Sequence, residues 1–96
     1  MAKAFVVAVS LAAVLVSQAV AQKIKPLQDR WERCLKSSFR VNRKQTADPN
    51  LAAERALQAC STEEDELWAV SADAGVPRSA FAHLKSAMKQ VLIEGK

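Results

Sequence analysis

Residues 34–60 read CLKSSFRVNRKQTADPNLAAERALQAC, and the stretch begins and ends with the only two cysteines of the chain. Its centre is polar from Asn42 to Ala47, which indicates a turn. Asp48 and Pro49 then supply an N-cap and a first helical residue. Two antiparallel helices rise equally per residue, so partners at equal height are equally distant from the turn. The midpoint of Cys34 and Cys60 is residue 47, and the stretch therefore predicts a helical hairpin that a disulfide can close.

The chain before the turn predicts a first helix over about residues 26–42. Pro26 suits the first turn of a helix, where its missing N–H costs nothing. One face carries apolar or small side chains at spacings of three and four residues, as an amphipathic helix requires. These residues are Leu27, Trp31, Cys34, Leu35 and Ser38. Trp31 is expected in the core.

The chain after the turn predicts further helices and no strand. A second helix is expected from Asp48 to Gly75, where the glycine is a C-terminal cap. Ser61 and Thr62 interrupt it, and either residue is a plausible cap for a new helix because four acids follow. The apolar phase matches on both sides, so we expect one long helix that is kinked or briefly broken there. A last helix is expected over about residues 77–94, with Phe81, Leu84, Met88 and Val91 or Leu92 on its apolar face. We predict an all-α bundle of three helices, with four as the alternative.

Residues 1–21 have the pattern of a secretory signal peptide. Lys3 is the basic start, the segment up to Val16 is almost wholly apolar, and the Ala19-x-Ala21 end is what a signal peptidase needs. Cleavage would leave residues 22–96 as one small helical domain, periplasmic or secreted, where a disulfide is stable. The alternative is a permanent anchor, since residues 4–21 are at the short edge of what spans a bilayer.

The charges of the mature chain are segregated along the sequence. Residues 23–47 carry a net charge of +6, residues 48–75 carry −6 and residues 76–96 carry +3. In the predicted hairpin the first two blocks face each other, with Arg30 level with Glu64. A nucleic-acid binder usually keeps its basic face unopposed, so we expect no nucleic-acid partner. No stable membrane insertion is expected once the signal is cleaved.

Three groups of residues are candidates for binding a partner. The acidic run, residues 63–66, is a candidate docking patch, with a solvated helix start as its alternative. The basic run beside Phe39 is a candidate contact for phosphate, anionic lipid or an acidic polymer, with a solvated turn as its alternative. Trp68 is either a contact residue or packs on the last helix. The candidates are Phe39, Arg40, Arg43, Lys44, Glu63, Glu64, Asp65, Glu66 and Trp68.

No group of residues in the sequence has the pattern of a catalytic site. The serines lack the context of a nucleophile elbow, and His83, expected at the surface, is the only histidine. Bridged cysteines are neither nucleophiles nor thiolate ligands, and a metal site needs more ligands than His83 offers. We therefore predict a protein that is not an enzyme and that holds no metal and no cofactor.

The pattern W-x-x-C-L at residues 31–35, followed by AAERAL-x-AC-x-x-EE at residues 52–64, resembles small exported two-cysteine helical proteins of proteobacteria. The resemblance covers most of the mature chain and implies an exported helical fold without implying an activity. A fainter similarity is to periplasmic acid-stress chaperones, which are also small, helical and bridged once, although no residue motif is shared.

These observations predict a non-enzymatic binding or interaction module in the periplasm or outside the cell. Its expected partner is a protein or a cell-envelope polymer. Two alternatives are a periplasmic chaperone for acid stress and an inhibitor of a cell-wall hydrolase. The acidic run would serve the inhibitor as a contact for a basic enzyme.

Overall fold

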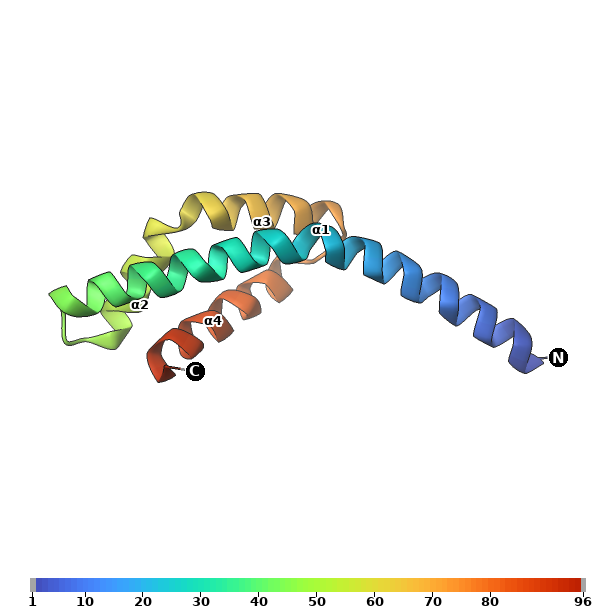
Figure 1. Ribbon diagram of the computed structural model, residues 1–96, viewed down its shortest axis with the longest axis horizontal. Helices are drawn as coiled ribbons and strands as arrows, with labels where there is room; N and C mark the ends of the chain where they lie inside the picture. Colours follow the sequence, from blue (N-terminus) through green and yellow to red (C-terminus); the bar gives the residue numbers. More distant parts are fainter. Residues whose placement is uncertain (1, 96) are drawn as a thin grey trace.

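The computed structural model describes the backbone of residues 2–95 and the side chains of residues 21–95. Its four helices are α1 (Ala2–Gln45), α2 (Pro49–Ala59), α3 (Ser61–Asp73) and α4 (Arg78–Glu94). In the view of Figure 1, α3 is drawn above α1 and α4 below it, and α1 contacts all three other helices. There is no strand in the part of the chain that the structure describes. The all-α prediction is confirmed.

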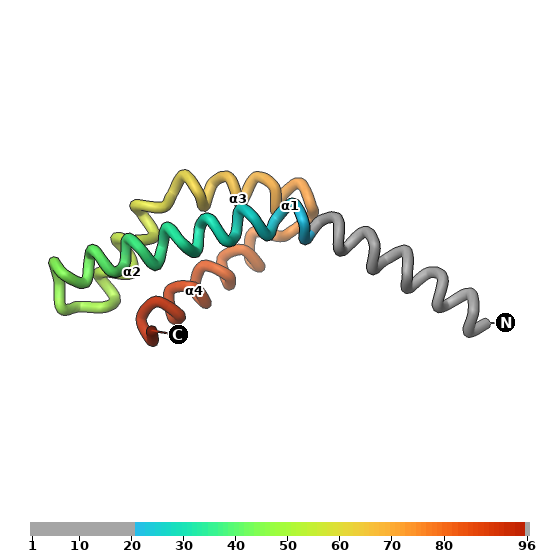
Figure 2. The backbone as a smooth tube through the Cα atoms, in the orientation of Figure 1, coloured from blue at the N-terminus to red at the C-terminus, as the bar shows by residue number. Residues whose placement is uncertain are grey.

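The hairpin turn forms at the predicted place but is shorter than predicted. α1 continues past Asn42 to Gln45, and the chain then reverses so that α2 and α3 run back along α1 (Figure 2). The Asp48 side chain caps α2 by accepting a hydrogen bond of 3.0 Å from the backbone N–H of Asn50. A side-chain hydrogen bond stabilises this extension of α1, because the Asn42 amide donates to the backbone carbonyl of Ser38 at 2.8 Å.

Pro26 lies inside α1 and not in its first turn, so the predicted start of the first helix was wrong. A proline within a helix removes one backbone donor and leaves the carbonyl four residues earlier, here that of Gln22, without its usual partner. Gln22 and Pro26 are both exposed. Water reaches that side of the helix, which lowers the cost of the missing hydrogen bond.

Cys34 and Cys60 form the predicted disulfide, with their Cα atoms 5.9 Å apart. Cys60 is fully buried and is the residue at which α2 ends and α3 begins. The break lies one residue before Ser61, and no side chain caps α3. The predicted interruption is thus a full break between two helices, and the four-helix alternative is confirmed. Glu63 and Glu64 in the first turn of α3 favour a new helix start there, because acids stabilise the positive end of a helix dipole.

Gly75 ends the α3 segment as predicted. Its φ of 89° lies in the left-handed region that glycine adopts without strain. Two hydrogen bonds of 3.0 Å complete a Schellman motif, from the N–H of Gly75 to the carbonyl of Ala72 and from the N–H of Val76 to the carbonyl of Ser71. Pro77 precedes α4, which begins at Arg78, one residue later than predicted.

The core lies where α1, the α2–α3 arm and α4 meet. Trp31 is fully buried, as predicted, and its ring stacks on Phe81 of α4 with the centroids 6.3 Å apart. Small alanines on the inner face of α2 allow that helix to approach α1 closely. The buried core cluster consists of Trp31, Leu35, Ala53, Ala56, Cys60, Leu67, Phe81, Met88 and Leu92. The apolar face predicted for the last helix is thus the one that is buried.

The signal peptide predicted for residues 1–21 lies outside the residues whose side chains are described, except for Ala21. Its cleavage and the anchor alternative are therefore still predictions. Among the residues that the structure describes, no helix combines the length and the apolar character needed to cross a membrane.

Replacing both cysteines with serine should destabilise the fold strongly. The bridge joins residues 26 positions apart, and a loop of that length corresponds to about 3 to 4 kcal/mol of unfolding free energy in the chain-entropy account. Urea denaturation of C34S/C60S, followed by circular dichroism, measures the loss. Because the chain has only these two cysteines, a reductant should bring the wild type to the level of the variant and leave the variant unchanged. Equal midpoints for the oxidised wild type and the variant would contradict the prediction.

Candidate functional site

Glu64 and Glu66, both from the acidic run at the start of α3, are held by bases from two different helices. The Glu66 carboxylate is 3.1 Å from the guanidinium of Arg30 on α1, and the Glu64 carboxylate is 3.0 Å from the Lys85 amine on α4. Arg30 thus pairs two residues beyond its predicted partner. Glu63 lies beside the disulfide and Asp65 is exposed. Half of the acidic run is therefore used to join helices.

This pairing leaves most of the basic charge of α1 without an acidic partner. Of the eight bases at positions 23–47, only Lys25 and Arg30 form ion pairs within the described part of the chain. Lys25 is 4.0 Å from Asp29 of its own helix. The expectation that the basic and acidic blocks neutralise each other across the hairpin holds for Arg30 alone. The C-terminal half of α1 remains strongly basic.

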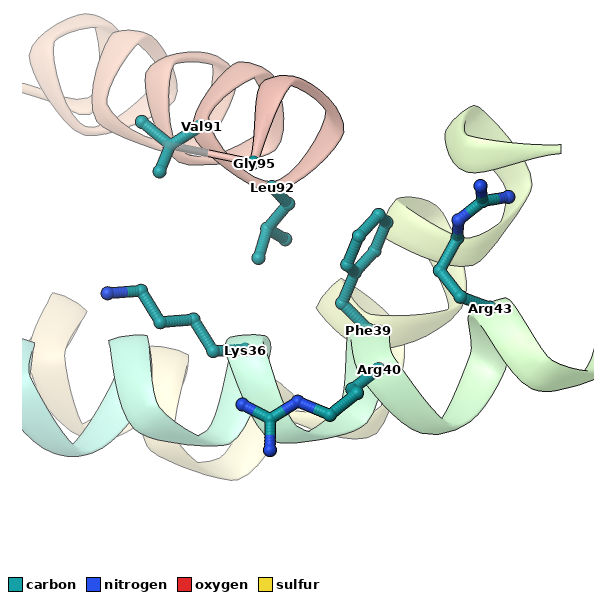
Figure 3. Close-up of a pocket in the computed structure, with 7 residues that line it drawn as sticks. All are labelled: Lys36, Phe39, Arg40, Arg43, Val91, Leu92 and Gly95. Atoms are coloured by element: carbon teal, nitrogen blue, oxygen red, sulfur yellow. The ribbon is translucent and has the colours of Figure 1, made fainter. Parts of the chain in front are cut away.

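A cleft with basic walls and an apolar floor lies between that half of α1 and the end of α4. Its volume is about 490 Å³. Phe39 and Leu92 point toward one another across it, one from each helix (Figure 3). We call it the cationic cleft, and its lining residues are Lys36, Phe39, Arg40, Arg43, Val91, Leu92 and Gly95. No acidic residue is among the described residues that line it.

The basic residues near the cleft differ in what their side chains do. Arg43 donates hydrogen bonds to two backbone carbonyls of the turn, to Ala47 at 2.6 Å and to Thr46 at 3.3 Å. Lys36 and Arg40 are exposed and form no ion pair with a described residue. Lys44, also a sequence candidate, is exposed but does not line the cleft. Lys36 and Arg40 are therefore the cations available to a ligand.

Trp68 packs on the last helix, which is the second of its two predicted alternatives. Its ring centroid is 5.1 Å from that of Phe81, and the guanidinium of Arg78 lies 4.8 Å from the Trp68 centroid in a cation–π contact. The hollow beside it is smaller, about 280 Å³, and its two acids are matched by two bases. Trp68 and Phe39 line different hollows and do not form one surface.

The cleft includes four residues that were not sequence candidates, namely Lys36, Val91, Leu92 and Gly95. Val91 and Leu92 belong to the predicted apolar face of the last helix, and Lys36 is one of the polar residues of the first. No pattern in the sequence shows where these two helices cross. The sequence therefore could not predict which residues this crossing brings together.

Among the described residues, atoms of the kind that bind metal ions gather beside the disulfide. The sulfur atoms of Cys34 and Cys60 and a carboxylate oxygen of Glu63 lie within 4.8 Å of one another. The two sulfurs are bonded to each other, so neither is a thiolate that can bind a metal ion. His83 is exposed on α4, as predicted for a surface histidine.

Comparison with known proteins assigns no family to this fold and cleft. No protein-family model matches the chain, and no curated protein or solved structure is significantly similar to it. The function must therefore be inferred from the cleft and from the sequence.

Replacing Arg43 with alanine should destabilise the hairpin, because Arg43→Ala removes both hydrogen bonds to the turn carbonyls. We expect the free energy of unfolding to fall by about 1 kcal/mol. Arg40→Ala is the matched control, since Arg40 is an exposed arginine on the same helix, and it should change the free energy by less than about 0.5 kcal/mol. Urea midpoints measure both. Equal losses in the two variants would show that Arg43 has no special role in the turn.

Proposed function

We propose that the protein is an exported, non-enzymatic binding module that takes up an anionic component of the cell envelope in the cationic cleft. The observation that carries the proposal is the cleft itself, with basic residues around an apolar floor and no acid among its described lining residues. Clefts of about 300 to 1,000 Å³ with a mostly apolar lining and a few polar groups are the usual form of ligand sites.

Export is supported by the disulfide and by the pattern of residues 1–21. Disulfides persist in oxidising compartments and are rare in the cytosol. The Cys34–Cys60 bridge joins α1 to the buried junction of α2 and α3, so the core of the fold includes it. A chain of this size has a marginal core and benefits from such a bridge.

Ligand binding is supported by the cost of leaving the cations unpaired. Lys36 and Arg40 are four residues apart on α1 and therefore neighbours on one side of the helix. Like charges at this spacing destabilise a helix by a few tenths of a kcal/mol. Arg40 and Lys44 repeat the spacing. An anion bound at the cleft would replace this repulsion with attraction, whereas the paired cations Lys85 and Lys89 need no ligand.

Mass spectrometry of the protein taken from the periplasm or the medium tests export directly. We expect a chain that begins at Gln22 and lacks the two hydrogens that are lost when Cys34 and Cys60 join. Treatment with a reductant should restore the mass of these two hydrogens. A chain that still carries residues 1–21 would favour the membrane anchor, and two free thiols would contradict the oxidising compartment.

Photo-crosslinking in living cells tests the cleft as the binding surface. A photoreactive amino acid at Val91, which lines the cleft, should form an adduct, and the same residue at exposed Ala72 on α3 should not. The mass of the adduct identifies the class of partner, including a protein or a cell-envelope polymer. Equal labelling at both positions, or none at Val91, would contradict the proposal.

The chaperone alternative has an observation of its own. Within the described part of the chain, the three ion pairs between helices each use a carboxylate of α2 or α3, namely Glu54, Glu64 and Glu66. Loss of these pairs would loosen the bundle, and such loosening is what the chaperone alternative requires. Protection of other proteins from aggregation in acid, with no adduct at Val91, would favour this alternative.

A further inference from the structure

We propose that the ligand of the cationic cleft is a single-chain anionic amphiphile, a molecule with one acidic head group on an apolar chain. This inference rests on the proposed function and narrows it to one chemical class. The apolar chain would lie along the floor between α1 and α4. The acidic head would lie at the rim, beside Lys36 and Arg40.

The floor of the cleft accounts for the apolar part of the ligand. Phe39, Val91 and Leu92 bring an aromatic ring and two aliphatic side chains to one place, from two helices. Leu92 is nearly buried at 5% exposure, while Phe39 and Val91 are half-buried and keep part of their surface in water. Covering such surface with a hydrocarbon chain stabilises a complex by about 25 cal/mol per Å². A small inorganic anion would leave this floor uncovered.

The rim accounts for the acidic head. Lys36 and Arg40 lie one helical turn apart, and neither has an acidic partner among the described residues. Arg43 is occupied by the turn carbonyls of Thr46 and Ala47, so it adds positive potential more than a direct contact. The lining charge is thus +3, with no acid to oppose it among the described lining residues. This charge complements an anion and repels a cationic amphiphile of the same length.

The limited volume of the cleft favours a free single-chain molecule over a membrane surface. A hollow of about 490 Å³ between two helices has room for one hydrocarbon chain. The hydrocarbon chains of a bilayer lie packed together below its surface, so none of them is free to enter a concave site alone. An amphipathic helix that binds the surface of a bilayer presents a continuous apolar face instead. In α1 the apolar face is turned into the core, with Trp31 and Leu35 fully buried.

Calorimetric titration of the protein, in the form in which it is exported, tests the inference with four probes. Dodecanoate below its micelle concentration should bind, and shortening the chain should weaken binding by about two- to fourfold per methylene. Dodecyltrimethylammonium, with the same chain and the opposite charge, should not bind. Acetate, which is a head group without a chain, should bind too weakly to detect. Vesicles of phosphatidylglycerol should bind no more tightly than vesicles of phosphatidylcholine.

Two pairs of variants locate the site. K36Q/R40Q removes both charges while keeping both side chains polar, and it should weaken dodecanoate binding at least tenfold. K23Q/R33Q is its matched control, because it removes one exposed lysine and one exposed arginine from the same helix outside the cleft. Val91→Ala should weaken binding severalfold, and Val70→Ala, a half-buried valine of α3, should not. Circular dichroism of each variant verifies the fold before titration.

The outcomes separate this inference from the proposed function. Equal binding of the two amphiphiles, or equal losses in K36Q/R40Q and K23Q/R33Q, would overturn the inference. Selective binding to phosphatidylglycerol vesicles without binding of dodecanoate would also overturn it, in favour of a membrane surface. An adduct at Val91 without dodecanoate binding would leave the cleft as a site for a different ligand. Absence of both would remove the proposed function as well.

Discussion

The arrangement of this small protein depends on one covalent constraint, the bridge from the C-terminal half of α1 to the junction of α2 and α3. Cys60 is at once the end of one helix, the start of the next and a fully buried core residue. The bridge holds that junction against α1 and so determines which faces of α2 and α3 meet Trp31 and Leu35. A chain of 75 residues after the predicted cleavage site has little apolar surface to spare. The disulfide thus supplies stability that a chain of this length cannot obtain from its apolar core alone.

The charges are arranged around this hairpin in two different ways. Toward the open end of the hairpin, acids of α3 join bases of α1 and α4, and each pair ties two helices together. Exposed pairs of this kind contribute little stability, but they disfavour other registers. Toward the turn, the bases of α1 form no ion pair with a described acid and instead surround apolar side chains. The charges of the described residues are therefore paired between helices at one end of the bundle and surround the proposed binding cleft at the other.

Local chemistry made much of the fold predictable. Asp48 and Gly75 were identified by features that act within a few residues, an N-cap and a left-handed glycine, and both lie where the sequence indicates. The midpoint of the cysteines located the turn because helical rise is uniform. The helix start predicted at Pro26 was wrong because a proline marks a helix start only when the preceding residues are not helical. The break at Cys60 was harder to place, since the apolar phase is the same on both sides.

The cleft was only partly predictable because it depends on long-range packing. Phe39 and Arg40 were candidates, since a basic run beside an aromatic ring is visible in sequence. Arg43 was a candidate for the wrong reason, because its fork of donors is used by the turn. Val91 and Lys36 become neighbours only through the crossing of α4 over α1. Nothing within a few residues of either side chain encodes that crossing.

The position of the disulfide has a consequence for α4. The covalent loop spans residues 34–60 only, and α4 lies outside it, held by Phe81, Met88 and Leu92 in the core and by ion pairs to α2 and α3. The cleft therefore lies at the boundary between a cross-linked part of the molecule and a helix that is held only by packing and ion pairs among the described residues. If the cleft holds the proposed ligand, its occupancy and the docking of α4 would share one equilibrium, in which each favours the other. The last helix would then be both a wall of the proposed site and the element whose local stability reports that the site is filled.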